Sequence, residues 1–578
     1  MNDKEFFQNP VEPMHKQYEA LRMFFVDDKT AEQTADRFGY TTNTIYTLIR
    51  DFRAKKKQGI ENPFFVTNMV GRKTKPEING AVEIIVALRK KYCSVQDIKS
   101  ILDAQRILVS EKQIHNILKK EGFARLPRRS KVAKKGVMSS LKMQATTSAL
   151  LNNEVDSFYS QDHMGTLCLL PYIHLFGIDK AINEVGFPGT STIPALNSIL
   201  AFIALKASNT RRYSSDDIWC MDRSLGLFAG LNVLPKTAWF TSYSHRVTRD
   251  MNLKLLRELN KVWIKNDLIS NTANLDFVAI PYWGEGEHLE NNWSGKRNKA
   301  LQSIQAAISH DPESGIITYG DTTIRHDDNA DVVVEFLDFY KAAGGADLKY
   351  LVFDSKFTTY QNLSKLDDKE VKFITIRRRS KKMIEDINNQ PKENWKKIRI
   401  PCSNKTRELK ILDNIVNLQY YGKNVRQLTI TGNGKIKPAI IITNDFDLSA
   451  EKIIHKYARR WLVEKTISEQ TYFFHLNNVS SSIVIKVDFD LTMTILTHNL
   501  YRLFAQDLDG YTNCSSATLH DKFFLNGGSV QINDNEIIIS LKKKRTLPLI
   551  LMAMKFFEKC QIPWLYSKKI KFVGASYS

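Results

Sequence analysis

The spacing of hydrophobic positions near the N-terminus predicts short helices. Between residues 17 and 53, apolar side chains recur every three or four positions, as on a helix with one buried face. Thr30 is placed to cap one helix, Gly39 supplies a turn, and Thr41 or Thr42 is placed to cap the next. The pattern predicts three short helices.

A second helical unit is predicted between about residues 79 and 125. Its apolar residues keep a helical spacing, Ser110 is placed to cap the last helix, and Gly122 to end it. Both units have the layout of a helix-turn-helix, although each could be an ordinary three-helix packing module. The DNA contacts expected from them are Asn43, Thr44, Thr47 and Arg50 on the last helix of the first unit, and Arg128 and Arg129 after the second.

The pattern changes from helical to alternating at about residue 270. From LDFVAIPY (275 to 282) to residue 378, the predicted order is three strands, a helix and two strands, which is the order of a ribonuclease H-like fold. A long helix is predicted over 449–477. The roughly 60 residues before it alternate like strands, and a structureless loop of that length is uncommon. We therefore expect an inserted β domain.

These patterns predict a multidomain α/β protein, since 578 residues exceed what one core normally holds. The expected parts are helix-turn-helix domains at 1–60 and 72–135, a helical domain at 150–268, a ribonuclease H-like α/β catalytic core at 270–380 and 441–510, an inserted β domain at 381–440, and a C-terminal region at 511–578.

The chain is strongly basic, with 83 Lys and Arg against 62 Asp and Glu and a net charge of +21. Such a balance favours a polyanionic partner, with nucleic acid as the first candidate and a basic housekeeping enzyme as the alternative. The six cysteines are scattered without a C-x-x-C pair, which argues against a zinc or redox site. With neither a signal-peptide pattern nor an apolar run of about 20 residues, we expect a cytoplasmic protein without a membrane partner.

Three acidic residues fall where the expected core would bring them together. Asp276 lies on its first strand, Asp354 at the end of its fourth, and Glu464 on the late helix. Carboxylates that converge in this way can hold the two divalent cations used in phosphoryl transfer. The assignment of the first acid to Asp276 has alternatives, because other acids are near it in the sequence: Glu285, Glu287, Asp321 and Asp327. Of these, we expect Asp321 to face solvent.

The late helix carries a distinctive stripe, formed by Tyr457, Arg460, Glu464 and Thr471 with Trp461 beside it. Arg460 could hold a phosphate oxygen while Glu464 holds a metal. The alternative is a plain surface ion pair between these two residues. Tyr457 and Trp461 lie on the same side of this helix, and two aromatic residues there argue against a face exposed to solvent.

The segment YARRWLVEKTISEQT resembles the Tyr-x2-Arg-x3-Glu-x6-Lys signature of DDE transposases of bacterial insertion sequences, which have a β domain inserted before the last acid. NLDFVAIPYWG and LKYLVFDSKF are similar to the segments with the other two acids. The resemblance implies that Asp276, Asp354 and Glu464 bind two Mg²⁺ or Mn²⁺ ions. It also implies DNA contacts by Tyr457 and Arg460. The family's Lys is replaced by Thr471, for which Lys456 or Lys465 could substitute.

The resemblance further implies double-stranded DNA partners, namely the terminal inverted repeats of a transposon and a target duplex, and a homodimer or higher oligomer paired through the C-terminal region. Two other functions stay open: a ribonuclease H-like nuclease without strand transfer, and a DNA-binding regulator derived from a transposase. The basic segments 376–382 and 541–545 could line a DNA channel or form a solvated face. Asn444 and Asp445 are interpreted as structural.

Overall fold

The structure is a computed structural model, and its contacts divide the chain into two units, Met1–Asn79 and Gly80–Ser578. We describe each unit by itself. The described residues are 3–59, 76–90, 93–104, 107–123, 145–147, 156–213, 219–282, 289–294, 298–345, 348–357, 359–402, 405–435, 437–478 and 483–575.

Residues 3–59 of the first unit contain helices α1 (Asp3–Gln8), α2 (Pro13–Phe25), α3 (Ala31–Phe38) and α4 (Thr42–Lys57). Thr30 caps α3 in a capping box with Gln33, and Gly39 ends it with φ of 63°, a backbone conformation that favours glycine. Thr41 caps α4. The three expected helices are thus present as α2 to α4, and α1 is an additional short helix.

The second predicted helical unit contains α5 (Pro76–Lys90), α6 (Val95–Ala104) and α7 (Glu111–Lys120). Ser110 caps α7 in a capping box with Gln113. The apolar core between these helices includes Ile98 and Ile114, and it is completed by Ile483 from the main body of the chain. This helical unit therefore shares its core with residues far along the sequence.

Residues 156–265 are mainly helical, but they begin with a strand that the sequence pattern did not predict. The elements are β1 (Asp156–Ser160), η2 (Met164–Leu169), α9 (Leu170–Leu175), α10 (Ile178–Val185), α11 (Ala195–Ala207), α13 (Arg223–Phe228), α14 (Thr237–Tyr243), η3 (Ser244–Arg246) and α15 (Arg249–Lys265). β1 pairs with β12 (Gly528–Ile532) near the C-terminus.

Strands of the C-terminal region complete a five-stranded sheet with β1, in the order β1-β12-β13-β15-β14. Its further elements are α22 (Ser516–Leu519), η8 (His520–Phe524), β13 (Glu536–Leu541), α23 (Leu547–Met554), η9 (Lys555–Phe557), β14 (Gln561–Ile562), η10 (Pro563–Leu565) and β15 (Lys568–Gly574). One hydrophobic core contains side chains from both the helical segment and this sheet, for example Phe202 and Phe524. The C-terminal region is therefore packed together with the helical segment.

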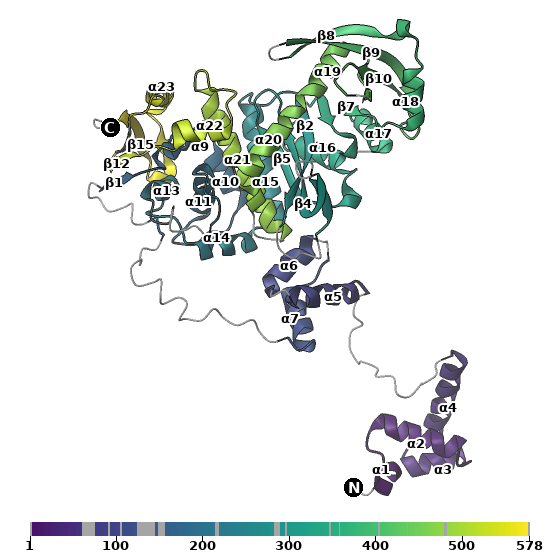
Figure 1. Ribbon diagram of the computed structural model, residues 1–578. Coiled ribbons are helices and arrows are strands. Elements are labelled where there is room, and N and C mark those ends of the chain that lie inside the picture. The colour runs from purple at the N-terminus through teal and green to yellow at the C-terminus, as the bar shows by residue number, and fades with distance from the viewer. Residues whose placement is uncertain are drawn as a thin grey trace. The chain divides into compact units, whose positions relative to one another are not determined.

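The central feature of the second unit is a ten-stranded mixed sheet (Figure 1). Its strands follow the order β3-β4-β2-β6-β7-β11-β10-β9-β8, with β5 paired to β4. Their bounds are β2 (Thr272–Pro281), β3 (Asn291–Ser294), β4 (Lys299–His310), β5 (Ile317–Ile324), β6 (Tyr350–Phe353), β7 (Lys372–Ile376), β8 (Lys396–Cys402), β9 (Lys405–Asn417), β10 (Asn424–Thr431) and β11 (Ala439–Thr443). β2 lies between antiparallel β4 and parallel β6.

Neighbouring side chains of a strand point to opposite faces of the sheet. Because the central strands carry apolar residues on both faces, helices cover both. On one face, Val352 and Ile374 pack with Ile453 of α19 (Ala450–Arg459). On the other, Phe353 and Phe373 pack in the core that includes α16 (Val332–Ala342) and α17 (Tyr360–Asp368). The short helices η4 (His326–Asp328) and η5 (Ser355–Phe357) lie in the connections of this region.

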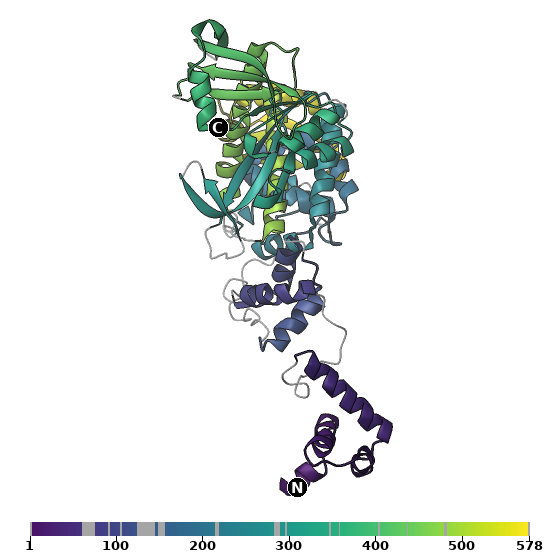
Figure 2. The same ribbon diagram turned by 90° about the vertical axis from the view of Figure 1, so that its right-hand side faces the viewer.

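The β-rich segment before α19 extends the same sheet. β8, β9 and β10 are joined through β11 to β7, the last core strand (Figure 1; Figure 2). The short helices α18 (Lys381–Asn388) and η6 (Lys392–Asn394) precede β8. Hydrogen bonding is thus continuous from the core into the insertion that we expected as a β domain. The limits that we expected for the individual domains stay predictions.

The long helix α21 (Val484–Gln506) connects the two large cores, to which it contributes residues such as Phe489 and Leu491. Its fully buried Asp488 pairs with Arg249 of α15 at 2.6 Å. Arg249 also pairs with Asp321 of β5 at 3.1 Å. Asp321 is buried, so our expectation that it faces solvent was wrong.

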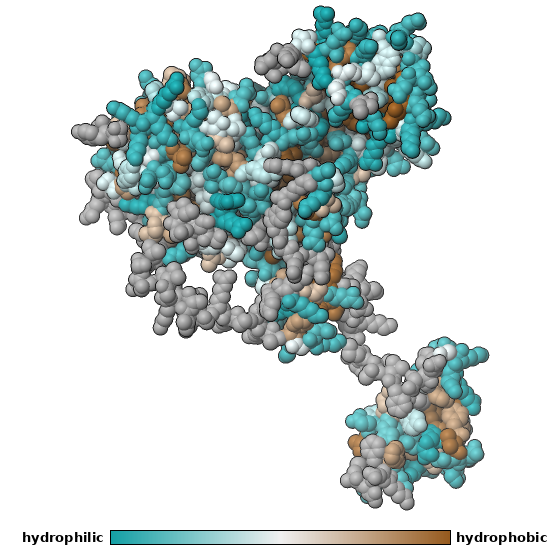
Figure 3. Space-filling model, viewed as in Figure 1, coloured by the Kyte–Doolittle hydropathy of each residue, from teal (hydrophilic) through white to brown (hydrophobic). Residues whose placement is uncertain are grey.

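The surface in Figure 3 is mostly hydrophilic over the coloured residues. Among the described helices, none combines the length and the apolar composition needed to cross a membrane.

Candidate active site

Asp276 lies on β2, and Asp354 directly follows β6, the parallel neighbour of β2. The register of β2 and β6 pairs Leu275 with Phe353. Asp276 is the residue after Leu275, and Asp354 is the residue after Phe353. Next to them, the rings of Phe277 and Phe357 stack with centroids 3.7 Å apart. The strand pairing thus brings the two acids to the same level along the two strands.

The late helix, which we expected to be continuous over 449–477, consists of α19 and α20 (Trp461–Tyr472) joined at Arg460, followed by η7 (Leu476–Asn478). At the junction, the amide of Val463 donates to the carbonyl of Arg460 at 2.9 Å. This three-residue spacing is tighter than that of an α-helix. α20 packs against β2 and β4.

Arg460 connects two of the three acids. Its Nη1 donates to Oδ2 of Asp276, and its Nη2 donates to Oε1 of Glu464 at 3.0 Å. Arg460 is only 8% exposed. The Arg460–Glu464 pair is therefore part of a partly buried cluster with β2 and differs from a plain ion pair on a surface helix.

The electrostatics of the cluster also involve Asp354. Burial raises the pKa of Asp276 to about 6; Arg460 opposes this shift, whereas the charges of Glu464 and Asp354 add to it. Burial lowers the pKa of Arg460, but the carboxylates, Asp276 first, hold it above its ordinary value. Burial likewise raises the pKa of Tyr457 to about 12. These five groups interact as one site.

The cluster has oxygen donors suited to hard divalent cations, which prefer carboxylates. In the described part of the chain, however, no three His, Cys, Asp or Glu side chains are placed together as a ready-made metal site. The guanidinium of Arg460, which bonds both Asp276 and Glu464, is the cation of this arrangement. The chemistry of the three acids fits a metal, and two of these acids are the ones that Arg460 bonds.

Other residues of the predicted stripe lie in different surroundings. Trp461 is 72% exposed, so it does not argue against a solvated face as we expected. The hydroxyl of Thr471 donates to the carbonyl of Ile467 within its own helix. Of the two possible substitutes for the missing Lys, Lys456 donates to Thr272, and Lys465 is exposed.

In the first unit, the outer surface of α4 carries the predicted DNA contacts Asn43, Thr47 and Arg50 as exposed residues. Thr44 is half-buried, and its hydroxyl is hydrogen-bonded to that of Thr41 at the cap. Tyr46 is an exposed aromatic residue on the same helix that we did not single out from the sequence. Tyr46 lies three residues after Asn43 and four before Arg50, and this helical spacing could have identified it as part of the same surface.

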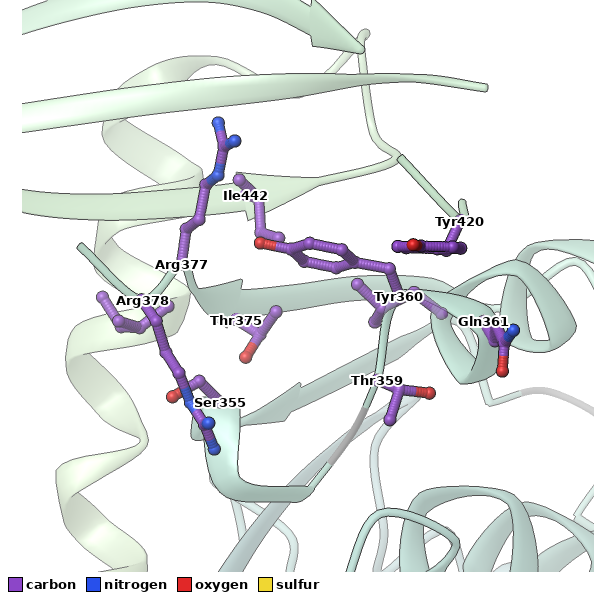
Figure 4. A pocket seen from close by; sticks show the side chains of 11 residues that line it. Ser355, Thr359, Tyr360, Gln361, Thr375, Arg377, Arg378, Tyr420 and Ile442 are labelled. Atoms are coloured by element: carbon purple, nitrogen blue, oxygen red, sulfur yellow. The ribbon is translucent and has the colours of Figure 1, made fainter. Parts of the chain in front are cut away.

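A pocket of about 480 Å³ is lined by Ser355, the residue after Asp354, and by Tyr360, Arg378 and Tyr420, among others. The amide and the hydroxyl of Ser355 both donate to Asp354. In Figure 4, Arg378 extends toward Ser355, whereas Arg377 points away from it. Arg377 donates to Gln427.

The two basic segments therefore differ in their surroundings. Segment 376–382 contributes Arg377 and Arg378 to the lining of this pocket. In segment 541–545, Lys544 donates to the carbonyl of Leu525. The sequence did not predict this pocket. Its lining combines Tyr360, which precedes β7, with Tyr420, which follows β9, and only the fold brings both to segment 376–382.

Several further residues named from the sequence are accounted for as follows. Asn444 accepts from the amide of Phe373, and Asp445 accepts from the hydroxyl of Tyr350 at 2.7 Å, so both have structural roles. Asp327 is exposed. Four residues lie outside the described part of the chain: Arg128, Arg129, Glu285 and Glu287.

Residues 282–500 match the family model of the transposase DDE domain. This part of the chain is therefore similar to a transposase DDE domain. The matched residues include Asp354 and Glu464, and Asp276 precedes them.

A search of curated protein sequences found no match. Among solved structures, this chain is similar to one described as the piggyBac transposase synaptic complex with hairpin DNA, at 9% identity and a TM-score of 0.34. The similarity covers 62% of this chain and 79% of that one.

Proposed function

We propose that this chain binds the ends of a transposon, cuts the DNA there and joins the 3′ ends to a target duplex. Asp276, Asp354 and Glu464 are the catalytic acids. The observation that carries the proposal is the arrangement around Asp276: the β2–β6 register aligns Asp354 with it, and Arg460 bonds both Asp276 and Glu464. The match of residues 282–500 to the transposase DDE domain supports the reaction class.

The strand order supports a ribonuclease H-like core. β5-β4-β2 are antiparallel neighbours, and β6 and β7 continue the sheet in parallel with β2. In this core the β2 and β6 acids project from a rigid sheet. Precise positioning of this kind is a large part of catalysis in phosphoryl transfer.

In this mechanism, Asp276, Asp354 and Glu464 would hold two Mg²⁺ or Mn²⁺ ions. Such ions supply Lewis-acid stabilisation of the phosphate and activation of the attacking oxygen. With the charge of these ions held by the acids, Arg460 would be able to donate to a phosphate oxygen. Burial of the guanidinium makes this interaction stronger than it would be in water.

DNA is held by further parts of the chain. The exposed Asn43, Thr47 and Arg50 enter a major groove as the outer surface of α4. Trp461 offers an exposed ring beside the acids, on which a base can stack. The net charge of +21 supports contact with a polyanion of considerable length. Two or more protomers act together on paired ends.

A ribonuclease H-like nuclease without strand transfer would use the same acids, and a DNA-binding regulator would need none of them. The test is incubation of the purified protein with Mg²⁺ and a duplex that carries the terminal inverted repeats flanking its gene. We expect cleavage at the repeat and joining of the 3′ end to a second duplex. Cleavage without joining identifies the nuclease, and binding without cleavage identifies the regulator.

A further inference from the structure

One face of β2 contacts the end of α19 at three successive alternate positions. The hydroxyl of Thr272 accepts from Nζ of Lys456 at 3.0 Å, Nδ2 of Asn274 donates to the carbonyl of Arg459 at 3.2 Å, and Asp276 accepts from Arg460. Alternate residues of a strand share a face, so these contacts follow from the strand period.

The middle contact lies where the helix is interrupted. Arg459 is the last residue of α19, and Val463 of α20 donates to Arg460 with the tighter spacing described above. A carbonyl at such an interruption needs a partner from outside the helix, because buried backbone groups left without one are costly. The side chain of Asn274 provides this partner for Arg459.

Asn274 makes this contact from a fully buried position. Its Oδ1 has no hydrogen-bond partner among the described residues. An apolar residue of similar volume would serve packing equally well at this position, so the donated hydrogen bond to Arg459 is the feature that requires an amide.

We infer that Asn274 is a positioning residue for the bridge formed by Asp276, Arg460 and Glu464, because its amide fixes the junction from which the last two residues project. The inference rests on the proposed function of the three acids. Asn274 acts through the backbone of Arg459 and touches neither DNA nor the reacting atoms. Loss of the amide lets the junction relax, and a displacement of about 1 Å at a catalytic group can slow a reaction by two orders of magnitude.

Asn260 provides a matched control for removal of the Asn274 amide. Asn260 of α15 is also buried, its Nδ2 donates to the carbonyls of Leu256 and Thr318, and its Oδ1 likewise has no partner within the described ranges. Asn260 lies in none of the contacts of the candidate active site. Asn274→Leu and Asn260→Leu therefore remove the same chemistry at two different places.

The test combines kinetics and hydrogen exchange on the full-length protein. For Asn274→Leu we expect kcat for end cleavage to fall at least tenfold, with KM for the end duplex within twofold of the parent. We also expect several-fold faster amide exchange in the peptide that spans residues 457–464. Asn260→Leu should change neither quantity beyond what its loss of stability explains.

Equal kcat values for the two variants, or unchanged exchange over residues 457–464 in Asn274→Leu, would overturn the inference. If Asn274→Leu does not accumulate as folded protein, Asn274→Ala is compared with Asn260→Ala in the same way. Absence of cleavage by the parent protein would refute the proposed function instead, and the exchange measurement would still decide whether Asn274 holds the junction.

Discussion

Asp276 gives a prediction about stability that needs no DNA. Its pKa is raised from an ordinary 3.8 to about 6, mainly by burial. A carboxyl with a raised pKa in the folded state contributes stability that is complete below pH 3.8 and is lost as the pH rises through 6. The shift of about two units corresponds to roughly 3 kcal/mol, since each unit is worth about 1.4 kcal/mol.

Asn cannot ionise, so Asp276→Asn removes this pH dependence. We expect the free energy of unfolding of the variant, relative to the parent, to increase by up to about 3 kcal/mol between pH 4 and pH 7. Any constant offset caused by the altered contact with Arg460 does not affect this change. Urea unfolding in EDTA, followed by fluorescence at several pH values, measures the difference.

The control is Asp327→Asn, which removes a carboxyl at an exposed position of the same region. Any pH dependence in this variant measures the effect of net charge alone. A difference between Asp276→Asn and the parent that stays flat from pH 4 to pH 7 would refute the reasoning. It would mean that Asp276 is far better solvated than its contacts indicate.

Three further predictions concern other parts of the chain. Arg249→Leu leaves Asp488 buried without its main cation and should lower the free energy of unfolding by about 3–5 kcal/mol; a loss below 1 kcal/mol in chemical denaturation would contradict this. Ser110→Ala removes the cap of α7 and should cost about 1 kcal/mol, measurable in the same way, whereas an unchanged stability would mean that the cap is dispensable. Arg50→Ala should weaken DNA binding and reduce the slope of log affinity against log salt by about 1, and an unchanged slope would exclude a phosphate contact.

Local sequence patterns predicted the elements whose structure is decided locally. The caps at Thr30 and Ser110 are formed as expected, because capping depends on a few adjacent residues. The order of core strands up to β7 also follows the alternation of hydrophobic residues. The spacing of the late helix identified Arg460 and Glu464 as a pair.

Features that depend on distant partners were not predictable. β1 is a strand because it pairs with β12, more than 360 residues away along the chain. Asp321 is buried because Arg249, from a helix before the sheet, supplies its countercharge. The inserted strands pair with β7 through β11, and no local pattern distinguishes such an extension from a separate sheet. The interruption at Arg460 likewise depends on contacts with β2.

The central claim is that Asp276, Asp354 and Glu464 together carry out DNA cleavage and joining. Its most direct test is a cleavage and strand-transfer assay with Mg²⁺ and an end duplex, on Asp276→Asn, Asp354→Asn, Glu464→Gln and the control Glu451→Gln, which changes an exposed acid on α19. We predict that each of the first three variants still binds the end duplex but loses cleavage and joining at least a thousandfold, as removal of an essential catalytic group typically does, while the control keeps both. Cleavage by any of the three at the rate of the parent would contradict the claim.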